Sequence, residues 1–226
     1  MAVRSVFDAE LTSFAGRQLA VSLPDEWVPV RTVAGRLGLT QSLAMQLMVS
    51  ELAGDLATGG QHPSSDRVDN CSDAGPWVIR SGSRLLMPRR GLELLASVPP
   101  VEGAPGRYIN VRLGPGTQCV VPEDRAQRPY LGFHRVFTER ERYDAATRWW
   151  TFRDAEEWIG APFVASIAGF VTLAGRIEAV ANCPWADGVS FTVDTSHLGI
   201  SSAFAGRRIP VHPGGPALKI TGSSKR

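Results

Sequence analysis

A segment rich in Pro and Gly, residues 99–106 (Pro-Pro-Val-Glu-Gly-Ala-Pro-Gly), divides this chain of 226 residues into two parts. Pro and Gly at this density interrupt helices and strands alike, so the segment is expected to be a linker. Apolar residues recur at helical spacing before the linker, and in short runs bounded by Gly or Pro after it. The sequence therefore predicts an α+β protein, with a mostly helical domain over 1–98 and a β-rich domain over 107–222.

The part before the linker is dominated by helical patterns. Pro29 suits the first turn of a helix, Gly38 suits its end, and Thr40 suits the N-cap of the next helix. Two short strands are predicted around Ser81-Gly82, after a long loop rich in Gly, Ser, Asp and Pro. The predicted helices cover 3–20, 29–37, 40–53 and 90–97; the loop covers 58–76 and the strands 77–80 and 83–88.

The apolar and small residues around Gly38 have the spacing of two helices joined by a tight turn. Ala34 lets the helices approach each other, and Leu37, Leu43 and Leu47 supply the apolar contacts between them. With the two strands as a wing, residues 26–98 resemble a winged helix-turn-helix domain.

That resemblance implies contact with DNA. The second helix offers polar side chains that suit base edges and phosphates, and the hairpin with the residues after it offers arginines for the DNA backbone. The predicted backbone contacts are Gln41, Ser42, Gln46, Arg80, Arg84, Arg89 and Arg90. A winged helix that is purely structural, or that contacts protein, remains the alternative.

The part after the linker reads as many short strands with two small helices. Thr138 and Glu141 form the pattern of a capping box at the start of a helix over 138–147, and a second helix is predicted over 154–159. Such a sequence of elements is typical of a small mixed β-barrel. The predicted strands are 108–113, 118–121, 130–137, 148–152, 163–173, 175–181, 189–194 and 207–212.

Several segments of this second part occur in a characteristic order. The aromatic and basic stretch Glu141–Trp150 is followed by the apolar stretches Phe163–Val171 and Ala174–Val180, and later by Phe204–His212. In this order the segments resemble the EVE-type branch of the PUA-like domains, which bind RNA or modified, extruded DNA bases. The resemblance implies a base pocket formed by Tyr143, Arg148, Trp149, Trp150 and Phe204, with Arg207 and Arg208 facing the nucleic-acid backbone.

The physical chemistry of an extruded base agrees with such a pocket. An aromatic side chain that stacks on a base contributes about 1–3 kcal/mol, and an arginine beside it can neutralise a phosphate or bind a base edge. Adjacent residues of a strand point to opposite faces, so only one of Trp149 and Trp150 is expected in the pocket and the other in the core.

Residues typical of catalysis or metal binding are not grouped in the sequence. The four histidines and three cysteines are scattered without metal-ligand spacing, and no phosphate-binding loop is present. Asp194, Ser196 and His197 are neighbours in sequence, which favours a local turn over a catalytic triad. We therefore expect no metal, no cofactor and no catalytic residue; a hydrolase that uses His197 or His212 is a minor alternative.

Composition indicates where the protein resides. No run of 18 apolar residues is present and the first twenty residues do not resemble a secretory signal, so we expect a cytoplasmic protein with no membrane partner. All basic residues but Lys219 and Lys225 are arginines, which suits either a GC-rich genome or the recognition of phosphates and guanine.

Together these observations predict a nucleic-acid-binding protein without enzymatic activity. DNA is favoured over RNA as the partner, with the winged helix on the duplex and the barrel on a base. The main alternative is a transcriptional regulator in which the barrel holds a small molecule. A pure interaction module is a further alternative, and the sequence leaves homodimer formation open.

Overall fold

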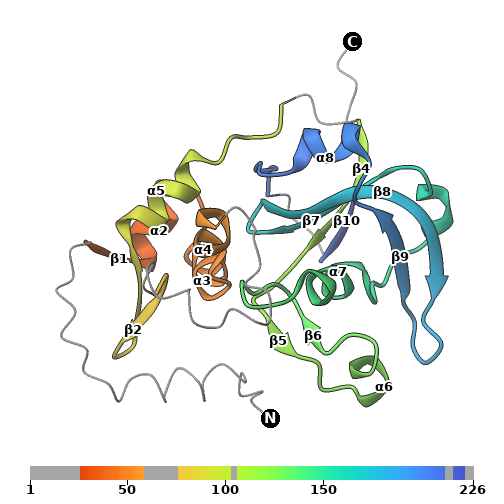
Figure 1. Cartoon of the computed structure of the whole chain (residues 1–226), viewed down its shortest axis with the longest axis horizontal. Coiled ribbons are helices and arrows are strands. Elements are labelled where there is room, and N and C mark those ends of the chain that lie inside the picture. The colour runs from red at the N-terminus through yellow and green to blue at the C-terminus, as the bar shows by residue number, and fades with distance from the viewer. Residues whose placement is uncertain (1–25, 59–75, 103–105, 212–215, 222–226) are drawn as a thin grey trace.

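The computed structural model describes residues 26–58, 76–102, 106–211 and 216–221, which form a mixed α+β protein. A helical unit and a sheet unit lie side by side, joined by the chain that leaves helix α5 (Figure 1). The helix predicted over 3–20, and all but the ends of the loop predicted over 58–76, lie outside the described residues. Within the described ranges, no helix is both long and apolar enough to cross a membrane.

The helical unit combines four helices with a small antiparallel sheet. The sheet has the order β1-β3-β2, so β1 pairs with the far strand of the hairpin. Its elements are β1 (Trp27–Pro29), α2 (Val30–Leu37), α3 (Gln41–Val49), α4 (Leu52–Ala57), β2 (Ile79–Ser81), β3 (Arg84–Pro88) and α5 (Arg89–Ser97). The predicted helices at 29–37 and 90–97 and the predicted hairpin are confirmed within one or two residues, whereas β1 was not predicted.

The turn between α2 and α3 forms as the sequence predicts. Gly38 adopts the left-handed conformation at the end of α2, with φ of 66°, and the Thr40 hydroxyl caps α3 by accepting a hydrogen bond from the Leu43 N–H. The single helix predicted over 40–53 is wrong, because Glu51 has a φ of 54° and separates α3 from α4.

The sheet unit is built on five strands in the order β10-β4-β7-β8-β9. Strands β4 and β7 are parallel, and the other neighbours are antiparallel. The strands are β4 (Arg107–Arg112), β7 (Pro162–Ile167), β8 (Phe170–Asn182), β9 (Val189–Asp194) and β10 (Ala217–Thr221). The described strands form an open sheet with β9 and β10 at its edges, so the small barrel predicted from the sequence is not closed.

Smaller elements complete this unit between β4 and β7 and after β9. They are β5 (Thr117–Gln118), α6 (Pro122–Arg125), β6 (Tyr130–Leu131), α7 (Glu139–Thr147), the 3-10 helix η2 (Ala155–Trp158) and α8 (Leu198–Phe204). The capping box of Thr138 and Glu141 at the start of α7 is confirmed. The strands predicted over 148–152 and 207–212 are wrong, because among the described residues these segments form only isolated bridges, at Trp150 and Arg208.

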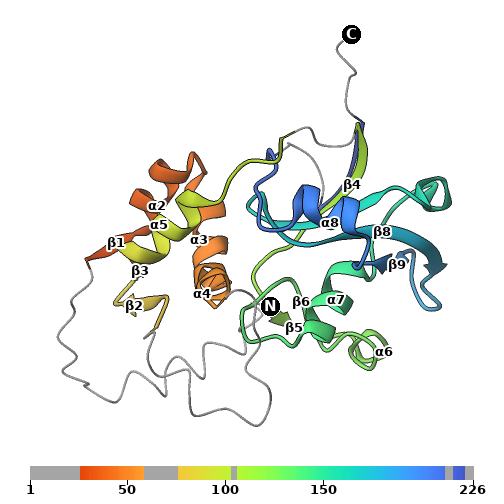
Figure 2. The ribbon, with the colours of Figure 1, turned by 45° about the horizontal axis from the view of Figure 1, so that its top comes forward.

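Helices cover both faces of the five-stranded sheet. Tyr143 and Ala146 of α7 pack on the face that belongs to the main core, which continues into the helical unit. Helix α8 covers the opposite face, where Ile200 and Phe204 pack against Tyr108 and Val164 in a smaller core (Figure 2). The sheet is therefore buried on two sides near its middle.

Two sets of contacts join the units. The Arg135 N–H donates to the Ser50 carbonyl at 3.1 Å, and Gly54 of α4 allows close approach, since a Cβ there would lie 2.6 Å from Trp77 and 2.9 Å from Arg135. On the linker side, Val101 and Arg208 pair through their backbones, with a distance of 2.7 Å from the Val101 N–H to the Arg208 carbonyl. The described part of the predicted linker is thus anchored to the sheet unit.

Candidate nucleic-acid interface

A groove lies between the start of α2, the outer face of α3 and the β2–β3 hairpin. Its volume is about 440 Å³, and its lining combines apolar residues with three arginines, Arg31, Arg80 and Arg84. Met45 of α3 also lines it and is 51% exposed, which is unusual for a large apolar side chain. The remaining lining residues are Pro29, Val30, Val49, Ser83 and Leu85.

Local sequence explains why the hairpin carries its arginines into this groove. Ser81 pairs with Arg84, so Gly82 and Ser83 form the two-residue turn, and Gly82 adopts a φ of 59° that suits such a turn. The hairpin is short and exposed at Arg80 and Arg84, both of which extend into solvent beside α3. The turn thus sets two guanidinium groups at the edge of the groove.

The three arginines of the groove have no carboxylate partner among the described residues. Some arginines elsewhere are paired, such as Arg142 with Asp55 and Arg128 with Asp124. Unpaired cations that line a concave surface attract an anionic partner, because nothing nearby cancels their field. The groove is therefore the candidate site for a polyanion.

The other residues of the helical unit that were predicted to contact DNA do not share one surface. Gln41 and Ser42 are exposed at the start of α3, whereas Gln46 faces a separate cavity toward the sheet. Arg89 pairs with Glu26 at 2.6 Å, which lowers the pKa of Glu26, and the Arg90 guanidinium lies 5.0 Å from the centre of the Trp77 ring. Sequence reasoning missed Arg31 and Met45, although α2 and α3 were both predicted.

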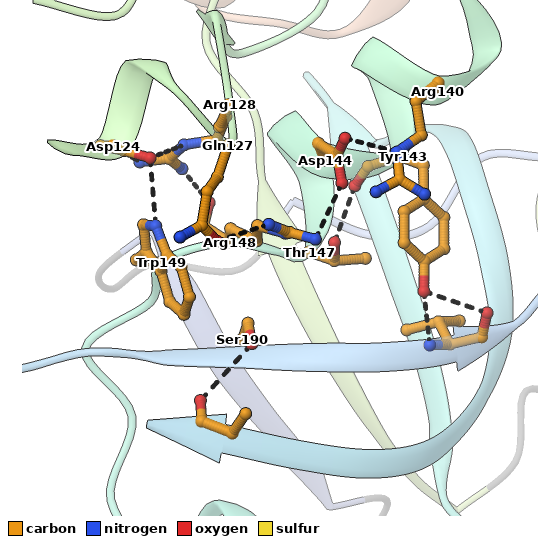
Figure 3. Close-up of polar contacts among 12 residues, drawn as sticks. Asp124, Gln127, Arg128, Arg140, Tyr143, Asp144, Thr147, Arg148, Trp149 and Ser190 are labelled. Carbon is orange, nitrogen blue, oxygen red and sulfur yellow. Dashed lines mark hydrogen bonds and ion pairs between the residues drawn. The ribbon is translucent and has the colours of Figure 1, made fainter. Parts of the chain in front are cut away.

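Trp149, which was predicted in the base pocket, makes contacts within the protein. Its indole N–H donates to the Asp124 carboxylate at 3.0 Å (Figure 3). Its ring lies edge-on to Trp185, with centroids 5.4 Å apart. The same carboxylate binds the Arg128 guanidinium and accepts a hydrogen bond from the Cys119 thiol at 3.4 Å. Burial is the main cause that raises the pKa of that thiol.

Arg148 lies beside Trp149, as predicted, but its guanidinium is engaged within the protein. It lies 5.8 Å from the centre of the Trp149 ring, donates to Gln127 at 3.0 Å and forms an ion pair with Asp144 at 3.3 Å (Figure 3). Asp144 is buried and also pairs with Arg140. The polar groups that the prediction assigned to a ligand thus hold α6, α7 and the segment after α7 together.

Tyr143 and Trp150 are likewise engaged in internal contacts. The Tyr143 hydroxyl accepts a hydrogen bond from the Val193 N–H at 2.8 Å, which joins α7 to β9. The Trp150 indole N–H donates to the Ala146 carbonyl at 2.7 Å, and its ring packs against the main core. Neither side chain, nor Trp149 or Arg148, lines the groove beside the hairpin or the cavity that Gln46 faces.

Phe204, which was predicted in the base pocket, lies in the smaller core of the sheet unit. Its side chain is 0% exposed and packs against Tyr108, with ring centroids 5.3 Å apart. The reason is that residues 198–204 form α8, whose apolar side packs on the sheet.

Arg207 and Arg208 contact the linker. Arg208 donates to the Val98 carbonyl at 3.1 Å and lies 5.6 Å from the centre of the Phe170 ring, while Arg207 donates to the Pro100 carbonyl at 3.4 Å. The predicted contact of Arg208 with phosphate is therefore replaced by an internal contact that anchors the linker.

The segment Asp194–His197 forms the local turn that the sequence predicts. The Asp194 carboxylate accepts hydrogen bonds from the Ser196 N–H at 2.9 Å and from its hydroxyl at 2.6 Å, which lower the pKa of Asp194. The Ser196 hydroxyl thus donates to a carboxylate, not to His197. Within the described ranges, no three His, Cys, Asp or Glu residues are grouped as metal ligands would be.

Comparisons of the chain with models of known protein families, with curated proteins and with solved structures find no match.

Proposed function

We propose that this protein binds duplex DNA through the groove between α3 and the β2–β3 hairpin. The proposal treats the helical unit as a winged helix-turn-helix domain, in which α2 and α3 form the two helices and the hairpin forms the wing. The sheet order β1-β3-β2 and the tight turn at Gly38 support this interpretation. The observation that carries it is a groove lined by three arginines that have no carboxylate partner within the described part of the chain.

In this proposal, α3 contacts the bases and the arginines of the groove contact the phosphates. The exposed start of α3 enters the major groove, where Gln41 can bind an adenine edge and Ser42 can bind a base or a phosphate. Arg31, Arg80 and Arg84 neutralise phosphates on either side of α3. DNA is favoured over RNA because the major groove of B-form DNA admits a helix, whereas that of A-form RNA is too narrow.

Base recognition through Trp149 or Trp150 is not part of the proposal. Both indole N–H groups are bonded to protein oxygen atoms, and Phe204 is buried. The similarity of the second part to EVE-type domains stays a prediction.

The proposal is tested by titrating a labelled duplex of about 20 base pairs with the full chain and following its fluorescence anisotropy. We expect micromolar or tighter binding at low salt, and a loss of at least tenfold when Arg31, Arg80 and Arg84 are changed together to Ala. A matched control changes Arg125, Arg153 and Arg176 to Ala, which removes the same charge from the sheet unit. Equal loss in both triple variants, or no binding by the unaltered protein, would contradict the proposal.

A further inference from the structure

A second cavity lies between α3 and the end of the five-stranded sheet. Its volume is about 380 Å³, within the range of sites that hold small molecules. Leu43 and Gln46 of α3 form one wall, and Asn110, Arg112 and Ser166 form the wall opposite. The rest of the lining is mainly apolar or backbone, and consists of Leu113, Gly114, Ala168, Gly169, Pro210, Val211 and Pro216.

The sheet changes character where it meets this cavity. Side chains on one face alternate along each strand, so Asn110 shares a face with Tyr108 on β4, and Ser166 shares a face with Val164 on β7. Tyr108 and Val164 pack beneath α8 in the smaller core. Two residues further along each strand, the same face presents the polar side chains of Asn110 and Ser166 where apolar ones would continue the core.

Asn110 and Ser166 are both buried, each 1% exposed, and they bind each other. The Ser166 hydroxyl donates to the Asn110 Oδ1 at 3.0 Å. Within the described ranges this is the only hydrogen bond of the Asn110 side chain, so its amide N–H2 group is left to donate. Asn110 lines the cavity, so a bound acceptor there would give this amide group a partner.

The backbone around the cavity departs from regular geometry at two adjacent places. A β-bulge shifts the register between β7 and β8 at Ser166, and Ala168, in the turn after it, has a φ of 50°. A positive φ is strained at a residue other than Gly, and bulges and strained residues are enriched at binding sites. Gly169 completes the turn, and a Cβ there would lie 2.7 Å from the Ile209 carbonyl.

From these observations we infer that the cavity binds a small organic carboxylate with an apolar body. The amide groups of Asn110 and Gln46 can donate to the carboxylate oxygens, and Arg112 adds a positive charge to the lining. No Asp or Glu is among the lining residues described here, so a carboxylate meets no opposing charge and an amine finds no counter-ion. Leu43, Leu113 and Val211 contact the apolar body.

The position of the cavity links the ligand to α3. Gln46 and Leu43 lie on the helix that exposes Gln41 and Ser42 at its start. A ligand that holds α3 against the sheet restricts the movement of α3 into the major groove of DNA. The affinity for the ligand and the affinity for DNA are therefore coupled. This coupling rests on the proposed function, whereas ligand binding itself does not.

The test measures ligand binding in the absence of DNA. The full chain is melted with benzoate, phenylacetate and 4-methylpentanoate, and with benzylamine and phenethylamine as matched cations. We expect at least one carboxylate to raise Tm by about 5 °C when present at about a hundred times its Kd, and the amines to leave Tm unchanged. Calorimetric titration of the best carboxylate then gives Kd for the variants.

Gln46→Leu and the double variant Asn110→Leu/Ser166→Ala are each expected to weaken the best carboxylate at least tenfold. Ser190→Ala removes a hydroxyl on β9, an edge strand that contributes no lining residue, and is expected to bind it normally. If the double variant does not fold, Gln46→Leu decides, because Gln46 is only partly buried. The inference is overturned if no carboxylate raises Tm, if an amine raises it equally, or if the cavity variants keep the affinity of the unaltered protein.

Discussion

Arg142 of α7 and Asp55 of α4 form an ion pair across the two units, with 2.7 Å between a guanidinium nitrogen and a carboxylate oxygen. Each side chain is only 16% exposed. Arg142 also donates to the carbonyls of Phe137 and Arg135, and its guanidinium lies 5.0 Å from the centre of the Phe133 ring. This pair fixes the helical unit, and with it α3, against the sheet unit.

Removal of the carboxylate from this pair should destabilise the protein. We expect Asp55→Ala to lower the free energy of unfolding by about 2 kcal/mol, because it leaves the Arg142 charge partly buried without its counter-ion. Urea denaturation of Asp55→Ala, Arg142→Ala and the double variant gives the coupling energy, expected to be about 1 kcal/mol or more. Additive effects of the two single changes would show that the pair contributes no coupling.

The hydrogen bond from Trp149 to Asp124 predicts a specific outcome for Trp149→Phe. The change keeps an aromatic ring but removes the N–H donor, so the free energy of unfolding should fall by about 1.5–3 kcal/mol, as for hydrogen bonds to charged groups. Trp150→Phe removes a bond to a neutral carbonyl and should cost less, about 1 kcal/mol. Both variants should keep the DNA affinity of the unaltered protein; selective loss in Trp149→Phe would restore the base-pocket prediction.

Several parts of the fold could be predicted because their signals are local. Gly38, Thr40 and the capping box of Thr138 and Glu141 each act within four residues, and all three behave as the sequence indicates. The contacts that decide the sites are not local. Asp124 lies 25 residues from Trp149, and Asn110 lies 56 residues from Ser166, so their pairing follows only from the packing of α6 and the parallel register of β4 and β7.

The orientations expected of Trp149 and Trp150 rested on a strand that does not form. A strand over 148–152 would point the two indoles to opposite faces. Instead, this segment follows α7 and forms one bridge, between Trp150 and Val189. Both indoles therefore find oxygen acceptors within the protein. The alternation of polar and apolar residues on β4 was visible in the sequence, but the cover that α8 gives to only part of that face was not, because α8 was not predicted.

His134 should make stability depend on pH. It is buried, and its Nδ1 accepts a hydrogen bond from the Val136 N–H at 3.3 Å. Burial, with smaller contributions from the charges of Arg135 and Arg142, lowers the pKa of His134 from 6.5 to about 4. The unfolded chain therefore binds a proton at His134 at higher pH than the folded protein does, and stability falls as the pH drops from about 6.5 to about 4.

Through His134, the free energy of unfolding should be about 3 kcal/mol lower near pH 4 than near pH 6.5. Urea denaturation at several pH values should show it as a difference between the unaltered protein and His134→Asn, which keeps an acceptor near the Nδ1 position but does not titrate. Burial raises the pKa of Glu51. Glu51 is present in both proteins, so its contribution to the pH dependence of stability cancels when the two are compared. Identical pH dependence in the two proteins would contradict this assignment.

The salt dependence of duplex binding tests the central claim most directly. If Arg31, Arg80 and Arg84 each neutralise a phosphate, the logarithm of the association constant falls with the logarithm of salt concentration by about 0.9 per contact. The triple Ala variant should therefore have a slope shallower than that of the unaltered protein by about 2–3, while the Arg125, Arg153 and Arg176 control keeps the original slope. Equal slopes in the unaltered protein and the groove variant would show that the groove does not contact DNA.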